Sequence, residues 1–259
     1  MTWRLRLLPP VLCFLLPAAV KAQSPQNVPQ LSEPHPGFGL PARQTLNYSV
    51  DWRVFPAGVV SFHQEAEGDT QHITVVGDSI GAVNLIYRVS DRFQSSFNRR
   101  TGCSIAFSKQ LQEGHRQVNS TLDFNYAQKK AVLDEKNLVS GITKHQEAPL
   151  PACVSDLLSA IFYTASQPLQ VGRSFQVPVY DAMRTVPVTM KVESRESLRT
   201  PSGTYQTVRV QPSADAGVVK NRGNIWIWYT DDERHIPVQM RARLFWGTLT
   251  FQLTSIDPK

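Results

Sequence analysis

Apolar and polar residues alternate along most of the chain from about residue 44 onward, with the period of two that is typical of β-strands. The run LNYSVDWRV shows this most clearly, because Leu46, Tyr48, Val50, Trp52 and Val54 would share one face of a strand. Pro56-Ala57-Gly58 is expected to form the next turn, and VVSFHQEAE its partner strand. The chain therefore opens with a predicted hairpin.

Similar runs follow to the C-terminus, separated by turn residues such as Glu113-Gly114 and Pro201-Ser202-Gly203. The expected strands are His72–Val76, Arg92–Asn98, Cys103–Gln112, Gln117–Asn125, RSFQVPVYD, TVPVTMKVESRESL, GTYQTVRVQP, NIWIWYT and PVQMRARLFWGTLTFQLTSI. Their spacing is typical of an antiparallel meander and not of βαβ units. The predicted fold is all-β and mainly antiparallel, as a barrel or a strongly curved half-barrel, because so large a sheet usually curls or closes.

One segment has helical periodicity instead. SDLLSAIFYTA, residues 155–165, places Leu157, Leu158, Ile161, Phe162 and Ala165 on one side of a helix. Ser155 is expected to cap the first turn, with Asp156 at its positive end, and Gln167-Pro168 ends it. We expect one short helix packed against the sheet.

Residues 1–22 are typical of a cleavable secretory signal peptide, with Arg4 and Arg6 before a short apolar run and Val20-Lys21-Ala22 before the cut. A membrane anchor is the alternative, but the run is shorter than the ~20 apolar residues that span a bilayer. Residues 23–43 are proline-rich and expected to be flexible, and residues 44–257 form a single β-rich domain. The predicted location is periplasmic or secreted.

Removal of the leader lowers the formal net charge from +6 to +3, because Arg4, Arg6 and Lys21 leave with it. Lysine and arginine are scattered along the remainder, which argues against a nucleic-acid partner. No later stretch is long and apolar enough to predict a transmembrane segment in the mature chain.

Cys103 and Cys153 remain after cleavage, and an even pair in an exported protein predicts a disulfide. Two buried free thiols are the first alternative. A metal site is the second, but no histidine or third cysteine stands at ligand spacing beside either residue. The histidines also lack any paired spacing, so no metal or cofactor is predicted.

Two motifs suggest chemistry. Gly77-Asp78-Ser79-Ile80-Gly81 matches the G-x-S-x-G turn that presents a serine nucleophile in α/β-hydrolases, and Asp181 or Asp231 with His235 would complete the chain order of a triad. The predicted sheet lacks the parallel scaffold that this turn requires, so a glycine-bounded turn is the simpler interpretation. No catalytic residue is therefore assigned.

The second motif is NIWIWYTDDERHIPVQM near the C-terminus. Trp226 and Trp228 would share one face of their strand and are candidate ligand-lining residues. Packing in the core is the more common role for such a strand. The acids after it would form a hairpin turn with Pro237 at the return, because three adjacent acids at a tip point in different directions.

Several segments together resemble a known bacterial family: LNYSVDWRVFPAGVVSF, CVSDLLSAIFY, TPSGTYQTVRVQP and IWIWYTDDERHIPVQMRARLFWGTLTFQL. The family is domain of unknown function 3108, whose members are exported envelope proteins. The resemblance implies a barrel-like or strongly curved antiparallel fold and carries over no catalytic residue. Family members usually have an arginine after the Phe-Tyr pair, whereas Thr164-Ala165 follows Phe162-Tyr163 here. The acidic hairpin is also similar to periplasmic lipoprotein carriers of the LolA and LolB type.

The predicted function is that of a non-enzymatic exported protein of the cell envelope, which binds or carries an amphipathic or polysaccharide ligand. The expected partners are a lipid, a glycan or another envelope protein. An assembly or scaffold protein is the first alternative, and a serine hydrolase using Ser79 is the second.

Overall fold

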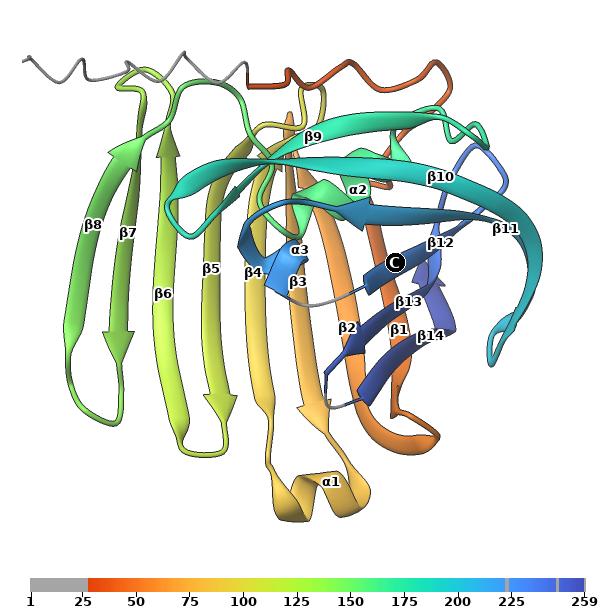
Figure 1. The fold of residues 1–259 in the computed structure, drawn as a ribbon, viewed down its shortest axis with the longest axis horizontal. Helices are drawn as coiled ribbons and strands as arrows, with labels where there is room; N and C mark the ends of the chain where they lie inside the picture. Colours follow the sequence, from red (N-terminus) through yellow and green to blue (C-terminus); the bar gives the residue numbers. More distant parts are fainter. Residues whose placement is uncertain (1–27, 222–223, 246, 259) are drawn as a thin grey trace, which may run out of the picture.

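The computed structural model describes residues 28–221, 224–245 and 247–258. Fourteen strands form one antiparallel sheet in the order β8-β7-β6-β5-β4-β3-β2-β1-β14-β13-β12-β11-β10-β9 (Figure 1). The strands are β1 (Arg43–Trp52), β2 (Phe55–Glu67), β3 (Thr70–Ser79), β4 (Ser90–Asn98), β5 (Ser104–Glu113), β6 (Arg116–Asn125), β7 (Lys130–Asn137), β8 (Thr143–Pro149), β9 (Ser174–Asp181), β10 (Arg184–Thr200), β11 (Gly203–Ser213), β12 (Asn224–Thr230), β13 (Pro237–Leu244) and β14 (Gly247–Pro258). The helices are α1 (Gly81–Ile86), α2 (Ser159–Ala165) and α3 (Gly217–Asn221).

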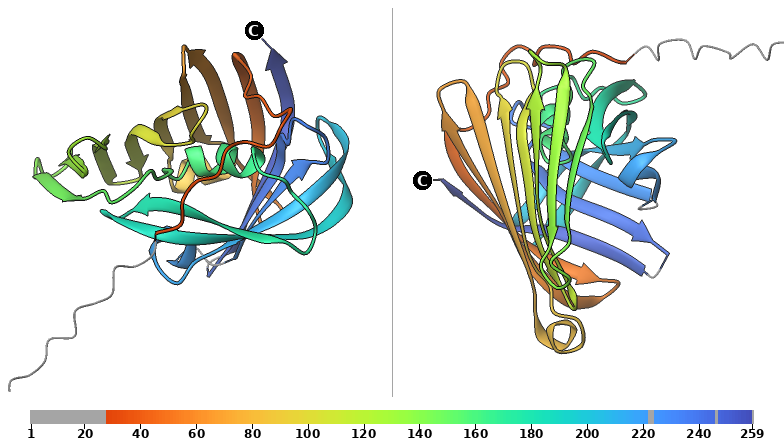
Figure 2. Two further views of the ribbon diagram at one scale, coloured as in Figure 1. Left: turned by 90° about the horizontal axis from the view of Figure 1, so that it is seen from above. Right: turned by 90° about the vertical axis from the view of Figure 1, so that its left-hand side faces the viewer.

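The sheet curls without closing, since β8 and β9 are its two edges and do not pair with each other. The two halves bend around α2, which lies between them when the molecule is seen from above (Figure 2). The prediction of a mainly antiparallel, strongly curved sheet with a short helix against it is confirmed, and of the two shapes left open the half-barrel is the one observed. We call the face of the sheet that contacts α2 the inner face, and the opposite face the outer face.

Helix α2 fills the space between the two halves of the sheet. Ala160, Tyr163 and Ala165 pack with valines of β9–β11, while Leu158 and Phe162 pack with apolar residues of β1–β4. A helix that is apolar on both sides is stable only when both sides are covered, and the curled sheet provides that cover. The core therefore depends on this one short helix.

Leu158 occupies the N-cap position of α2, and the side chain that caps the turn leading into the helix is that of Asp156 and not Ser155, which corrects the sequence expectation. The Asp156 Oδ1 atom accepts hydrogen bonds from the backbone N–H groups of Leu158 at 2.8 Å and Ser159 at 3.0 Å, as a capping side chain does. Ser155 instead pairs by its backbone with β9 beside Pro178 and Tyr180. That pairing covers part of the β9 edge.

The first hairpin turns earlier than predicted. Strand β1 ends at Trp52, and Arg53 turns the chain with a φ of 58°. Pro56 to Gly58 already belong to β2, so they are not the turn, and Val54 is 81% exposed instead of sharing the buried face of β1. Leu46, Tyr48 and Val50 do form that buried face, as the alternation predicts.

Several elements were not predicted from the sequence. Strands β7 and β8 and the short helices α1 and α3 were not among the expected elements, and the last long run divides into β13 and β14 at a turn that ends on Gly247. Gly247 has a φ of 147°, and a Cβ atom there would lie 2.5 Å from the Trp52 indole nitrogen, so only glycine fits. In the described part of the chain, none of the helices is long and apolar enough to cross a bilayer.

The predicted signal peptide lies outside the described residues. The described part of the proline-rich segment, residues 28–42, crosses over α2 (Figure 2). The Ser32 N–H group donates to the Tyr163 hydroxyl at 2.7 Å, and the His35 N–H group donates to the Ser166 carbonyl at 2.8 Å. Leu31 and Phe38 pack against the same core cluster as α2. This part of the segment thus contributes to the domain.

Candidate functional site

Strand β12 is covered on both faces. Ile227 and Tyr229 lie on the inner face, where the Tyr229 hydroxyl donates to the Ile161 carbonyl of α2 at 2.9 Å. Because neighbouring residues of a strand point to opposite faces, Trp226 and Trp228 lie on the outer face. The sequence predicted this division of the strand correctly. Trp228 belongs to the buried cluster that also includes Leu158 and Phe162, and Trp226 packs against that cluster.

The Trp228 ring is only 4% exposed and is surrounded by protein. Its indole N–H group donates to the Glu196 carboxylate at 2.9 Å, and the Arg241 guanidinium lies 5.4 Å from the ring centroid. Trp226 is only partly buried, so it keeps accessible surface. A ligand-lining role for the two tryptophans stays a prediction, and Trp226 is the residue with room for contact.

The acidic turn after β12 is a hairpin, as predicted. Asp232 accepts hydrogen bonds from the Thr230 hydroxyl and from the Arg234 backbone and side chain. Burial alone would raise the pKa of Asp232, but these hydrogen bonds and the Arg234 charge outweigh it and lower the pKa. Asp231 points elsewhere, to the Arg195 side chain at 2.7 Å. The acids diverge, and among the described residues no three His, Cys, Asp or Glu side chains converge as metal ligands would.

The G-x-S-x-G motif spans the end of β3 and the start of α1. The Ser79 hydroxyl donates to the Asn84 side chain at 2.8 Å, and it accepts a hydrogen bond from the Val89 N–H group at 2.9 Å. His235 is engaged elsewhere, with its Nδ1 atom 2.6 Å from the Ala165 carbonyl. The predicted triad partners are therefore not brought together with Ser79, and the motif acts as a glycine-bounded turn.

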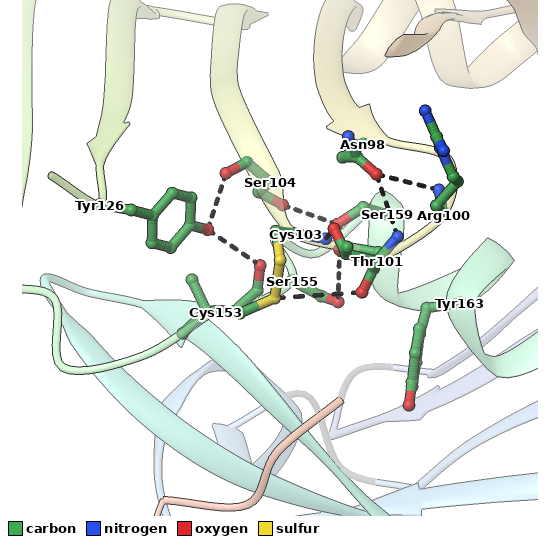
Figure 3. Close-up of a disulfide and its surroundings, with 12 residues drawn as sticks. Asn98, Arg100, Thr101, Cys103, Ser104, Tyr126, Cys153, Ser155, Ser159 and Tyr163 are labelled. Carbon is green, nitrogen blue, oxygen red and sulfur yellow. Dashed lines mark hydrogen bonds between the residues drawn. A yellow bond between two sulfur atoms is a disulfide. The ribbon is translucent and has the colours of Figure 1, made fainter. Parts of the chain in front are cut away.

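Cys103 and Cys153 form the predicted disulfide, with their Cα atoms 5.1 Å apart (Figure 3). The bond joins the start of β5 to the segment that leads into α2, so β5, β6, β7 and β8 lie within the loop that it closes. Nearby, the Tyr126 hydroxyl donates to the Ser104 carbonyl at 2.8 Å (Figure 3). Burial of this phenol raises the pKa of Tyr126 to about 12. The surroundings of the disulfide are therefore structural.

Asp156 is the most buried acid of this region, at 1% exposure. Besides capping α2, it accepts hydrogen bonds from the Ser95 and Ser104 hydroxyls, both at 2.6 Å, through its second carboxylate oxygen. Both carboxylate oxygens are thus occupied by donors from β4, β5 and α2. The carboxylate holds these three elements together and leaves no free oxygen for a substrate.

A different set of residues emerges on the inner face of β4–β7, where α2 does not reach. Residues that pair directly on neighbouring strands project from the same face of the sheet. Ser95 faces inward and pairs with Phe107, which pairs with Leu122, which in turn pairs with Leu133, so all three apolar side chains lie on the inner face. Each of the three is only partly buried. Phe93, two residues before Ser95, stacks on Phe107 with ring centroids 6.5 Å apart.

Charged residues lie beside these apolar side chains on the same face. Lys109 pairs with Phe93 across the ladder, and its Nζ atom is 3.5 Å from the Glu135 carboxylate. Lys144 of the edge strand lies opposite Glu135 and is exposed. We call this set the inner strip: Phe93, Phe107, Leu122, Leu133, Lys109, Glu135 and Lys144. The strip was not predicted from the sequence, because β7 and β8, which carry Leu133, Glu135 and Lys144, were not predicted as strands.

The outer face of the same strands carries a polar groove of about 540 Å³. Its outward-facing lining residues are Gln94, Ser108, Gln110, Asn119, Thr121, Asp134, Lys136, Thr143 and His145, and Lys109, Ser120, Glu135 and Lys144 of the same strands also border it. The His145 Nδ1–H group donates to the Asp134 carboxylate at 2.7 Å, and this hydrogen bond and the carboxylate charge raise the pKa of His145. The two faces of these strands thus differ sharply in chemistry.

An unclosed, curled antiparallel sheet with a helix inside and an amphipathic inner face defines this chain as a β-barrel-like protein. The chain matches the family described as "Protein of unknown function (DUF3108)" over residues 47–254, and it belongs to that family. No curated protein matches it. The family resemblance found in the sequence is thereby confirmed.

Solved structures support the fold. The chain is similar to a β-barrel-like protein of domain of unknown function DUF1849 from Brucella abortus, with a TM-score of 0.55, 11% identity, and coverage of 83% of this chain and 97% of that one. Two more distant structures are a candidate exported protein with a YmcC-like fold from Bacteroides fragilis (TM-score 0.39, 8% identity, 85% and 98% coverage) and a candidate lipoprotein from Parabacteroides distasonis (0.36, 9%, 85% and 98%). At such identities the likeness concerns the fold alone, and the last two scores are too low to support a conclusion.

Proposed function

We propose that this protein is an exported, non-enzymatic protein of the cell envelope that binds an amphipathic, lipid-like ligand on its inner strip. The observation that supports this most is the exposure of apolar side chains on the inner face of β4–β7. Elsewhere on this face α2 covers the apolar residues, whereas Phe107, Leu122 and Leu133 are only partly covered. Partly exposed apolar side chains that share one face are the usual lining of a ligand site.

The charges beside the strip favour an amphipathic ligand over a purely apolar one. An acyl chain can lie along the phenylalanine and leucine side chains, while an anionic head group reaches Lys144 at the edge strand. The Lys109–Glu135 pair, whose side chains are 28% and 31% exposed, separates the two regions. The leader-like N-terminal sequence, the disulfide and the family resemblance support an exported location.

The test uses palmitoyl lysophosphatidylglycerol as the probe and native mass spectrometry with calorimetry as the readout. Leu133→Asp places a charge on the strip, and Val132→Asp places the same charge on the other face of the same strand. Loss of one apolar side-chain contact predicts binding weaker by about tenfold for Leu133→Asp and little change for the control. Equal affinities for the two variants, or no binding by the native protein, would refute the proposal.

The polar groove supports a second candidate, a glycan ligand on the outer face. Its lining offers hydroxyl, amide and charged groups from five neighbouring strands, which can hydrogen-bond to sugar hydroxyls. Thr121→Arg would fill the groove from the outer face and leaves the apolar residues of the inner strip unchanged. Oligosaccharide binding that is lost in this variant and kept in Leu133→Asp would assign the ligand to the groove.

A further inference from the structure

One end of the sheet collects five of its connections. In an antiparallel meander alternate turns lie at the same end, so β1–β2, β3–β4, β5–β6, β7–β8 and β13–β14 turn together at the end that carries α1 (Figure 1). Backbone hydrogen bonds link neighbouring tips: Arg53 donates to Thr248, Ile80 to Ala57, and Leu138 to Gln117. We call this row of turns the α1 end.

Large apolar side chains protrude from the α1 end into solvent. Four separate tips contribute, with exposures of 81% for Val54, 61% for Phe55, 87% for Leu85, 86% for Ile86, 65% for Val139, 68% for Ile142 and 100% for Phe245. Helix α1 has no buried residue at all, so its apolar side chains do not support the core. Single exposed apolar residues are ordinary, but a row of them along one end marks an interaction surface.

The opposite end lacks this feature. Within the described residues, the turns β2–β3, β4–β5 and β6–β7 carry none of the exposed large apolar side chains. The β2–β3 turn bears Glu67 and Asp69 instead. The most exposed apolar side chains are therefore gathered at one end of the molecule, whereas Ile105 and Val171, at 42% and 44% exposure, stand singly elsewhere.

The charges around these tips identify the kind of partner. Residues 52–60, 80–89, 136–144 and 241–249 contain Arg53, Arg88, Lys136, Lys144, Arg241 and Arg243, and no aspartate or glutamate. One carboxylate, Glu113, lies at the β5–β6 turn of the same end, where the Arg116 guanidinium pairs with it at 2.6 Å. The other nearby carboxylates, Asp51, Asp78, Asp91 and Glu135, stand one or two residues farther from the apolar tips along their strands. Apolar tips flanked by basic residues complement an anionic lipid surface, in which acyl chains lie beneath acidic head groups.

We propose that the α1 end docks on the surface of an anionic lipid bilayer, with the apolar tips entering the interface. The tips are separate points along the end of a sheet and do not enclose a groove, so they suit a broad fluid surface better than one protruding side chain of a protein. This docking surface shares only Lys144 with the inner strip, and it does not require that the inner strip bind a ligand.

The test is co-sedimentation of the protein, purified from its own host, with vesicles of phosphatidylcholine alone or mixed with phosphatidylglycerol. Native protein should bind the mixed vesicles, and binding should weaken as salt rises because exposed charges are screened. Leu85→Asp/Ile86→Asp should reduce binding at least tenfold, and Arg88→Glu should reduce it about fivefold. Val171→Asp is the matched control, because Val171 is also exposed, at 44%, but lies between α2 and β9.

Circular dichroism and the urea midpoint establish that each variant is folded. Native protein that ignores mixed vesicles, or an α1 variant that binds as well as Val171→Asp, would overturn the proposal. Light scattering tests the competing occupant: a native dimer that becomes a monomer in the α1 variant, without vesicle binding, would assign the surface to a second copy of the chain. Lysolipid binding to the inner strip, measured without vesicles, separates failure of this proposal from failure of the proposed function.

Discussion

Replacing both Cys103 and Cys153 by serine tests how the β5–β8 half of the sheet is held. The cysteines are 50 residues apart in sequence, and the loop between them contains four complete strands. In the unfolded chain the bond restricts this loop, and the chain-entropy model gives a stabilisation of about 4 kcal/mol at room temperature. The loss is large beside the total stability of a domain, which is roughly 5–15 kcal/mol.

The assay is equilibrium unfolding in urea, followed by tryptophan fluorescence and by circular dichroism. The double serine variant should lose about 4 kcal/mol in free energy of unfolding and about 10 °C in melting temperature. Chemical reduction of the native protein is the matched control and should give the same loss, because it removes the same constraint without a substitution. Both forms should keep a native-like spectrum, since the Asp156 hydrogen bonds to Ser95 and Ser104 remain.

Two results would refute this reasoning. A loss below about 1 kcal/mol would show that the β5–β8 loop is already restricted in the unfolded chain. Two reactive thiols in denatured, non-reduced protein would show that the bond does not form.

Three further predictions concern single side chains. Asp156→Ala should cost about 3 kcal/mol in urea unfolding, because it removes the α2 cap and two buried hydroxyl partners, whereas Asp156→Asn keeps an acceptor for the cap and should cost less. Burial lowers the pKa of His235, whose titratable neighbours are His35, Asp231 and Asp232. The unfolded state therefore binds more protons than the folded state, and the free energy of unfolding falls as the pH drops below about 6.5, the ordinary pKa of histidine. His235→Asn removes the titrating group, and asparagine tolerates the φ of 42° at this position. The urea midpoint of this variant should depend less on pH between neutrality and mild acid, and an unchanged dependence would contradict the prediction. Glu196→Gln keeps an acceptor for the Trp228 indole and should shift the fluorescence of Trp228 less than Glu196→Leu, and equal shifts would show that the hydrogen bond is unimportant.

The sequence predicted most of the strands that bury at least one apolar face and missed β8, whose two faces both meet solvent. Strand β8, TKHQEAP, is exposed along almost its whole length, so neither face selects apolar residues and no alternation arises. Its position follows only from pairing with β7. The β13–β14 turn was missed for the opposite reason, since Phe245 continues the apolar run although it is fully exposed.

The candidate surfaces depend on register, which the sequence pattern alone does not determine. Leu122 and Leu133 become neighbours only because β6 and β7 pair at that position. The exposed residues of the α1 end likewise come from four separate turns, and the meander brings these together. In contrast, the disulfide, the α2 periodicity and the acidic hairpin are local or compositional signals, and for these the sequence was sufficient.

The two proposed surfaces lie close together along one strand. Strand β4 starts at Ser90, directly after the α1 segment, and Phe93 of the inner strip is three residues farther along. At about 3.3 Å per residue, the strip begins roughly 10 Å from the α1 end. An amphipathic molecule that leaves a bilayer beneath the apolar tips would thus reach Phe93 after moving less than the thickness of one lipid leaflet, about 15 Å of hydrocarbon. Docking and ligand binding would then be successive steps of one transfer, and Arg88→Glu should slow lysolipid uptake from anionic vesicles while leaving the affinity for free lysolipid unchanged.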